Sequence, residues 1–279
     1  MSAGTCTSDP DWLGDYHLNG YHFPLAAFSE TRAQELRREL ETVEAQYSDR
    51  PELHALAIGH ANAVLPFVDA MTRLPSILEP IKAILGPDVL VWNASFFIKQ
   101  PRTEDYISWH QDLTYWGLSD AHEVTAWVAL TTSNAASGCV KFIPGSHTNS
   151  IVEHRDTFDE NNLLSRGQEL AVDVDENEAV SVELRPGEMS LHHGRVFHGS
   201  HPNRSDDRRI GLAIRYITPA MKQTTNDKTH ARLVAGEDRF GHFRLRAAPR
   251  DVLHSRDVSA VQEHIEMSRR FLFAGTERS

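Results

Sequence analysis

The sequence has too little cysteine for a disulfide scaffold and no long hydrophobic run. Its 279 residues contain two cysteines, Cys6 and Cys139, which we expect to be free thiols rather than parts of a disulfide framework or a zinc site. No apolar stretch approaches the roughly 20 residues that a membrane-spanning helix requires. Residues 1–10 show no basic region followed by an apolar one, as a secretory signal would. These absences predict a cytoplasmic protein that does not associate with a membrane.

Positive charge is also scarce. The chain has 28 Lys and Arg against 39 Asp and Glu, a formal net charge of −11. Because nucleic-acid binding depends on Lys and Arg that neutralise phosphates, we expect no nucleic-acid partner. Histidine, in contrast, is abundant, with 16 residues. The question for the rest of the sequence is whether these imidazoles converge on one site.

Helical patterns dominate the first third of the chain. The segment TRAQELRRELETVEAQY places apolar residues three and four apart behind a capping box of Thr31 and Gln34, which predicts a helix that packs on one side. A second helix is predicted over residues 77–85, with Gly86-Pro87 as its stop signal. The C-terminal segment SAVQEHIEMSRRFLF predicts a closing helix.

From about residue 88 the hydrophobic period changes to two. Short strands are predicted over residues 89–100, 124–131, 139–144, 179–184, 188–193 and 209–217, and Arg185-Pro186-Gly187-Glu188 predicts a tight hairpin turn. This order favours one mainly β domain over residues 1–279, an antiparallel sandwich or barrel with helices packed on one side. The polar segments 147–178 and 222–241 are predicted as long loops that serve as lids.

The densest chemical signal is the segment WHQD. In an extended segment residues i and i+2 share a face, so His110 and Asp112 present an imidazole and a carboxylate side by side. Such a pair is common on protein surfaces and needs a third ligand to make a metal site. Two histidines and one carboxylate suit non-haem Fe(II) and leave coordination positions open. The segment LHHGRVFHGSHPNRSDDRR offers four histidines for the third position: His192, His193, His198 and His201.

A dicarboxylate co-substrate that chelates iron through one end needs a cation at its other end. A guanidinium offers a rigid fork for that carboxylate. In the strand RIGLAIRYI, Arg209 follows His198 by eleven residues, and Arg215 lies on the same strand face because the offset between the two arginines is even. Arg208 is expected to point the other way.

Three segments resemble the phytanoyl-CoA dioxygenase family of Fe(II)/2-oxoglutarate oxygenases. They are SWHQDLTYWGL, VTAWVALTTSNAASGCVKFIPGSH and MSLHHGRVFHGSHPNRSDDRRIGLAIRYI. The resemblance extends over about residues 16–220 and rests on an HxD…HGSxxN…R frame, which is far more specific than HxD alone. It implies a double-stranded β-helix, a jelly-roll of the cupin type, with iron near its open mouth.

The resemblance also implies the ligands of that iron and of its co-substrate. The iron ligands fall on His110, Asp112 and His198, and the arginine that grips the C5 carboxylate of 2-oxoglutarate falls on Arg209. Fe(II), 2-oxoglutarate and dioxygen are the implied cofactor and co-substrates.

Further positions are predicted around this set. Ser200 is expected to add a hydroxyl to the same carboxylate, and Trp127, which alternates away from its apolar neighbours, to line the co-substrate pocket. Asn203 is expected to stabilise the turn after HGS. His192 and His193 remain alternative third ligands, and His193 is expected to approach the site.

The predicted reaction is hydroxylation of an unactivated carbon of a small-molecule substrate, with release of succinate and carbon dioxide, in natural-product or small-metabolite metabolism. Because Asp112 is retained, the halide position of related halogenases is not expected. Desaturation and cyclisation are variant outcomes of the same oxidant. The alternatives are an acyl-CoA hydroxylase of the same mechanism, a cupin-like metalloenzyme that does not use 2-oxoglutarate, and a non-catalytic barrel that binds a small ligand.

Overall fold

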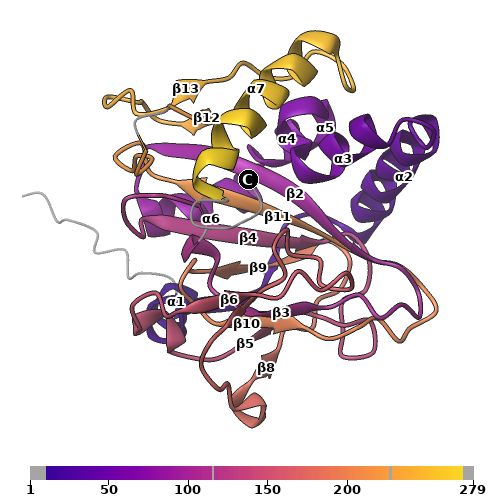
Figure 1. The fold of residues 1–279 in the computed structure, drawn as a ribbon, viewed down its shortest axis with the longest axis vertical. Coiled ribbons are helices and arrows are strands. Elements are labelled where there is room, and N and C mark those ends of the chain that lie inside the picture. Colours follow the sequence, from indigo (N-terminus) through magenta and orange to yellow (C-terminus); the bar gives the residue numbers. More distant parts are fainter. Residues whose placement is uncertain (1–10, 115, 226–227, 273–279) are drawn as a thin grey trace, which may run out of the picture.

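Two facing β-sheets and a set of helices make up the protein (Figure 1). The computed structural model describes residues 11–114, 116–225 and 228–272, without the side chains of residues 269–272. The large sheet has the strand order β1-β9-β4-β11-β2-β12-β13, and the small sheet has the order β3-β10-β5-β8. The large sheet comprises β1 (Tyr21–Ala26), β2 (Val89–Lys99), β4 (Glu123–Ala129), β9 (Glu188–His192), β11 (Arg209–Ile217), β12 (His230–Ala235) and β13 (Arg244–Leu245). The small sheet comprises β3 (Ile107–His110), β5 (Lys141–Phe142), β8 (Val180–Ser181) and β10 (His198–Ser200).

Most of the helices cover the outer face of the large sheet, away from the small sheet, while the first lies beside the edge strand β1 and the last against β12 (Figure 1). The helices are α1 (Asp11–Asn19), α2 (Glu30–Gln46), α3 (Pro51–Gly59), α4 (Ala61–Val64), α5 (Pro66–Met71), α6 (Pro75–Leu85) and α7 (Ser255–Leu272). The main hydrophobic core lies between this outer face and the helices, and a second core lies between the two sheets. The expected jelly-roll, with helices packed on one side, is therefore confirmed.

Strand β11 runs through the middle of the large sheet. It is antiparallel to both β4 and β2, with Ala213 opposite Trp127 and Arg209 opposite Lys99. Because side chains alternate along a strand, β11 sends one set of residues into the helix-covered core and the other set into the space between the sheets. The predicted boundaries of this strand, residues 209–217, are confirmed.

Two local predictions are wrong in detail. The cap of α2 is Ser29, whose hydroxyl accepts a hydrogen bond from the Arg32 N–H at 3.2 Å, so the helix begins before the predicted Thr31 box. The turn at Arg185–Glu188 forms, with Gly187 at a φ of 90°, but it does not close a hairpin. It connects β8 in the small sheet to β9 in the large sheet, because the two strands pair with different neighbours.

The two polar segments predicted as loops contain short strands. An antiparallel ribbon of β6 (His154–Asp156) and β7 (Gln168–Leu170) lies within 147–178, and β12 lies within 222–241. β6 and β7 have three residues each, which is too few to show an alternating pattern. Cys139 is a buried free thiol, and Cys6 lies outside the described residues. In the described part of the chain, no helix has the length and apolar character needed to cross a bilayer.

Candidate active site

His110, Asp112 and His198 come together between the sheets. His110 ends β3, Asp112 begins a 3₁₀ turn (Asp112–Thr114), and His198 begins β10 directly opposite His110. One ligand atom from each residue lies within 4.8 Å of the others, and all three side chains are buried. The prediction that His110 and Asp112 share one face of an extended segment is wrong, because the strand ends at His110 and the chain turns before Asp112. The turn still brings His110 Nε2 to 3.6 Å from Asp112 Oδ1.

Hydrogen bonds fix how the two imidazoles point. His110 Nδ1 lies 2.9 Å from the Ser108 carbonyl oxygen, and His198 Nδ1 lies 3.0 Å from that of Val196. Each Nδ1–H can donate to its carbonyl, which leaves the Nε2 lone pair free to bind a metal.

The protonation states of the cluster also suit a divalent cation. Burial lowers the pKa of His198 well below its usual value, which favours a neutral ring. Burial alone raises the pKa of Asp112, but His110 and His192 together hold it well below its ordinary range. Neutral imidazoles beside an ionised carboxylate form the donor set that binds non-haem iron.

The neighbouring histidines differ from each other. His192 is buried, with its Nε2 3.6 Å from Asp112 Oδ2, so it lies beside the cluster without joining the group of three mutually close ligand atoms. His193 points away, since its Nδ1 accepts a hydrogen bond from the Arg195 N–H at 3.0 Å and its ring packs near His147. The expectation that His193 approaches the site is wrong, because β9 ends at His192 and the next side chain faces the opposite side.

Arg209 is a fully buried cation. Its exposed fraction is 0%, and within the described residues none of its three guanidinium nitrogens has a hydrogen-bond partner. Its Cζ lies 5.4 Å from the centroid of the Trp127 ring. Burial lowers its pKa to about 10, so the group stays protonated at neutral pH. A buried, unpaired guanidinium is costly, and an anionic ligand would remove that cost.

The cavity around the cluster reaches the inner face of β11, the strand that carries Arg209. Besides His110, Asp112 and His198, its lining includes Trp127, Ser200 and Ala213. Between Arg209 and Ala213 stands Gly211, where the Cβ of any larger residue would lie only 1.9 Å from the Trp127 ring. Gly211 therefore leaves room for the Trp127 ring, which borders both this cavity and Arg209.

Lys99 is a site residue that sequence reasoning missed. It lies opposite Arg209 in the sheet, is fully buried, and donates from Nζ to Ser200 Oγ at 2.6 Å. Burial, followed by the charge of Arg209, lowers its pKa to about 6. The sequence signal for its burial was its position two residues after Phe97, because alternate residues of a strand share a face and Phe97 faces the space between the sheets. The predicted Ser200 hydroxyl is thus bound to a lysine.

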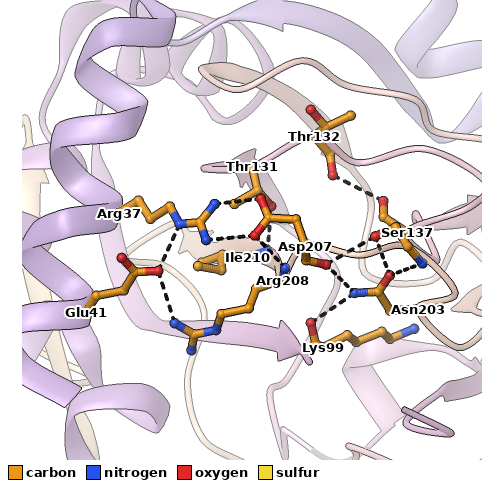
Figure 2. Close-up of polar contacts among 11 residues, drawn as sticks. Arg37, Glu41, Lys99, Thr131, Thr132, Ser137, Asn203, Asp207, Arg208 and Ile210 are labelled. Carbon is orange, nitrogen blue, oxygen red and sulfur yellow. Dashed lines mark hydrogen bonds and ion pairs between the residues drawn. The ribbon is translucent and has the colours of Figure 1, made fainter. Parts of the chain in front are cut away.

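The turn before β11 fixes these two cations in place. Asn203 Nδ2 donates to the carbonyl oxygens of Lys99 at 3.2 Å and of Asp207 at 2.8 Å, as Figure 2 shows. Asn203 therefore stabilises the turn, as the sequence indicates for this residue. On the other side of the same turn, Arg208 reaches Glu41 of α2 (Figure 2).

A larger cavity of about 600 Å³ opens from the cluster along β2. Within β2, β12 pairs with the first residues, Val89–Val91. The later part of β2 therefore borders this cavity. Its inner end is lined by His110, Asp112 and Arg215, and α7 contributes His264 and Ser268 to its far wall. No chemistry was predicted for α7, because nothing in its sequence shows which strand it packs against.

Comparisons with known proteins agree with this geometry. The profile of the phytanoyl-CoA dioxygenase family matches residues 16–211. The chain belongs to the phytanoyl-CoA dioxygenase family. Among curated members of this dioxygenase family and its relatives, a probable alpha-ketoglutarate-dependent hypophosphite dioxygenase of Stutzerimonas stutzeri is 29% identical over 152 residues, 53% of this chain and 52% of that protein. The phytanoyl-CoA dioxygenase domain-containing protein 1 of Rattus norvegicus is 31% identical over 177 residues, 61% of this chain and 60% of that protein. The chain thus spans about half to three fifths of the length of these relatives.

Solved structures share the fold of this protein over most of its length. The apo form of the non-heme monooxygenase ThoJ is 30% identical, with a TM-score of 0.84 over 94% of this chain and 97% of that one. CytC3 with Fe(II) and alpha-ketoglutarate is 21% identical, with a TM-score of 0.61 over 88% of this chain and 98% of that one. The second likeness concerns the fold alone.

Proposed function

We propose that this protein is an Fe(II)- and 2-oxoglutarate-dependent dioxygenase that hydroxylates an unactivated carbon of a small-molecule substrate. The observation that carries the proposal is the pairing of two features in one barrel. A buried cluster of two imidazoles and a carboxylate lines a cavity together with Trp127, and Arg209, whose guanidinium has no hydrogen-bond partner among the described residues, lies beside the same Trp127 ring. That pair fits a metal and a dicarboxylate that chelates it.

In this proposal His110, Asp112 and His198 would hold the iron. Arg209 would bind the C5 carboxylate of 2-oxoglutarate, and Ser200 and Trp127 line the cavity that would take its carbon chain. Fe(II) and 2-oxoglutarate, when bound, supply with dioxygen the oxidant for an unactivated C–H bond and release succinate and carbon dioxide. The protein's own contribution is to orient these groups and to exclude water from a site whose ligands are all buried.

Residues 1–279 form one domain in this proposal, and segments 147–178 and 222–241 act as lids. The first segment has support from the cavity lining, since Leu163, Leu164 and Gln168 border the large cavity beside Asp112. The second rests on its polar sequence. A cytoplasmic location stays a prediction.

The proposal is tested by adding Fe(II) and 2-oxoglutarate to the protein without oxygen. The bound chelate gives a weak visible charge-transfer band, which we expect for the wild type and for His193→Ala, the control whose side chain faces away from the cluster. His110→Ala should abolish the band because it removes a ligand. A wild-type protein that takes up neither iron nor 2-oxoglutarate would contradict the proposal.

The substrate class is tested by measuring which candidate compounds stimulate the release of succinate. Stimulation by small metabolites fits the proposal, whereas stimulation confined to acyl-CoA thioesters would favour an acyl-CoA hydroxylase. Metal-dependent turnover without any succinate would favour a cupin-like enzyme that does not use 2-oxoglutarate.

A further inference from the structure

We propose that the 600 Å³ cavity binds a small organic carboxylate, with its carboxylate group on Arg215 and its apolar body against the aromatic wall of the cavity. The inference rests on the proposed function, because it takes this cavity as the substrate site. It adds the chemical class of the substrate and the residue that recognises it.

Arg215 is a second buried guanidinium, and it forms no ion pair with an acid among the residues that the structure describes. It is 8% exposed, and Nη1 donates to Ser95 Oγ at 2.7 Å, while its Nε is buried without a hydrogen-bond partner in the described part of the chain. Its Cζ lies 5.2 Å from the Trp116 ring centroid and 5.7 Å from that of Phe97. Since it lines both the cluster cavity and the large cavity, it stands where a substrate would meet the metal.

Asp112 and Glu123 act on Arg215 through their charge, but neither forms an ion pair with it among the described residues. Burial, followed by the charge of Asp112, raises the pKa of Glu123 well above its ordinary value, which favours its neutral form. In the proposed function the carboxylate of Asp112 is a ligand of the metal. Together, a divalent metal, Asp112, a co-substrate dianion and Arg209 carry no net charge. The positive charge of Arg215 is then unbalanced in a buried site, where such a charge is costly and an anion is favoured.

The remaining titratable groups of the cavity do not oppose an anion. Burial, followed by the charge of Arg246, lowers the pKa of His60 to about 4, and burial also lowers that of His264. Glu44 forms an ion pair with Arg208 at 2.7 Å and lies 3.8 Å from His54. No unpaired carboxylate therefore faces Arg215 across the described lining.

The rest of the wall favours an apolar body. The rings of Trp92 and Trp116 stack with centroids 5.0 Å apart, and Phe96, Ile98 and Leu164 continue the lining. A mostly apolar cavity of this volume with a few polar groups is typical of a site for a small organic molecule. Because Arg215 lies at the cluster end, a carboxylate on it places the adjacent carbons, rather than the distal end of the substrate, beside the metal.

A matched pair of probes tests the proposal directly. We would measure the binding of 3-phenylpropionate and 4-phenylbutyrate, and of their primary amides, to protein loaded anaerobically with Fe(II) and 2-oxoglutarate, by calorimetry and by quenching of the tryptophans. The carboxylates should bind at least about tenfold more tightly than their amides, as charge-assisted hydrogen bonds predict. Arg215→Gln should remove this difference, and Arg215→Lys should restore part of it. The control Arg185→Gln, at an exposed arginine that pairs with Glu188 outside the cavity, should leave it unchanged.

Equal binding of acids and amides, or no binding of either by the wild type, would overturn the inference. So would an Arg215→Gln variant that keeps the difference but loses affinity for 2-oxoglutarate, since Arg215 would then serve the co-substrate. The 2-oxoglutarate titration on the same samples separates the two proposals. Carboxylate preference in a protein that binds no 2-oxoglutarate would overturn the proposed function and support the carboxylate site.

Discussion

The two faces of β11 contrast sharply in what they bury. Toward the helices the strand presents Ile210, Leu212, Ile214 and Tyr216, all fully buried in the main core. Toward the small sheet it presents Arg209, Gly211, Ala213 and Arg215. The first set packs against apolar neighbours, whereas the second brings two guanidinium groups into the interior and leaves nitrogens of both without partners in the described structure.

Arg208 and Arg209 show the same contrast in adjacent residues. Arg208 donates to Glu44 at 2.7 Å and to Glu41 at 3.3 Å, while the neighbouring Arg37 pairs with Asp207, so this side of the turn is fastened to α2 (Figure 2). Arg209, one residue later, points inward and has no partner among the described residues. One face of the strand therefore stabilises the fold, and the other keeps charges available for ligands.

The largest effect is expected from truncation on the helix-facing side. Leu212→Ala removes a fully buried side chain of the main core and should lower the free energy of unfolding by about 2–5 kcal/mol. Urea unfolding measures this loss. The 2-oxoglutarate dissociation constant of the folded variant should stay within about twofold of the wild type. A large change in that constant would mean that the two faces are coupled.

A smaller effect is expected from filling the gap on the inner face. Gly211→Ala forces the Trp127 ring to move and should cost about 1–3 kcal/mol of stability, as overpacking does. It should also raise the 2-oxoglutarate dissociation constant by about tenfold, or about 1.4 kcal/mol. Gly14→Ala in α1, where a Cβ meets nothing within 4 Å, is the control and should change neither quantity adversely. Unchanged co-substrate binding in Gly211→Ala would show that the position of the Trp127 ring does not matter for 2-oxoglutarate.

The last expected effect concerns how the free energy of unfolding changes with pH. Since the pKa of Lys99 falls from 10.5 to about 6 on folding, the unfolded chain binds more protons between these values, and its contribution makes stability rise with pH across that window. Lys99→Met should flatten this rise between about pH 7 and 9, above the range where histidines titrate. The exposed Lys222→Met should keep the wild-type slope. Equal slopes in all three proteins would show that Lys99 is not held in this depressed state.

Much of the fold could be predicted because local patterns determine it. The alternation in RIGLAIRYI gave the boundaries of β11 and the opposite directions of Arg208 and Arg209. Pairing could not be predicted in the same way. The turn at Arg185–Glu188 has the residues of a hairpin, yet its strands lie in different sheets, because long-range packing decides which strands become neighbours.

In the candidate site, too, residues within a local sequence pattern could be predicted, whereas features that depend on long-range packing could not. His110, Asp112, His198 and Arg209 could be predicted as site residues because they stand in a specific sequence frame, and the structure brings the first three together and buries the fourth. Lys99 was missed because a lysine near the end of a strand is usually exposed, and only its register opposite Arg209 reveals its burial. The cavity walls were missed because α3, α7 and β2 meet only in three dimensions.

A titration of 2-oxoglutarate into Arg209→Gln and Arg208→Gln, each loaded with Fe(II) without oxygen, tests the central claim most directly. Arg209→Gln should bind the co-substrate about two orders of magnitude more weakly than the wild type, because a buried carboxylate would lose its charged partner, while iron uptake should be retained. Arg208→Gln should bind it as the wild type does. Similar affinities in both variants would contradict the assignment of the inner face of β11 to ligand binding.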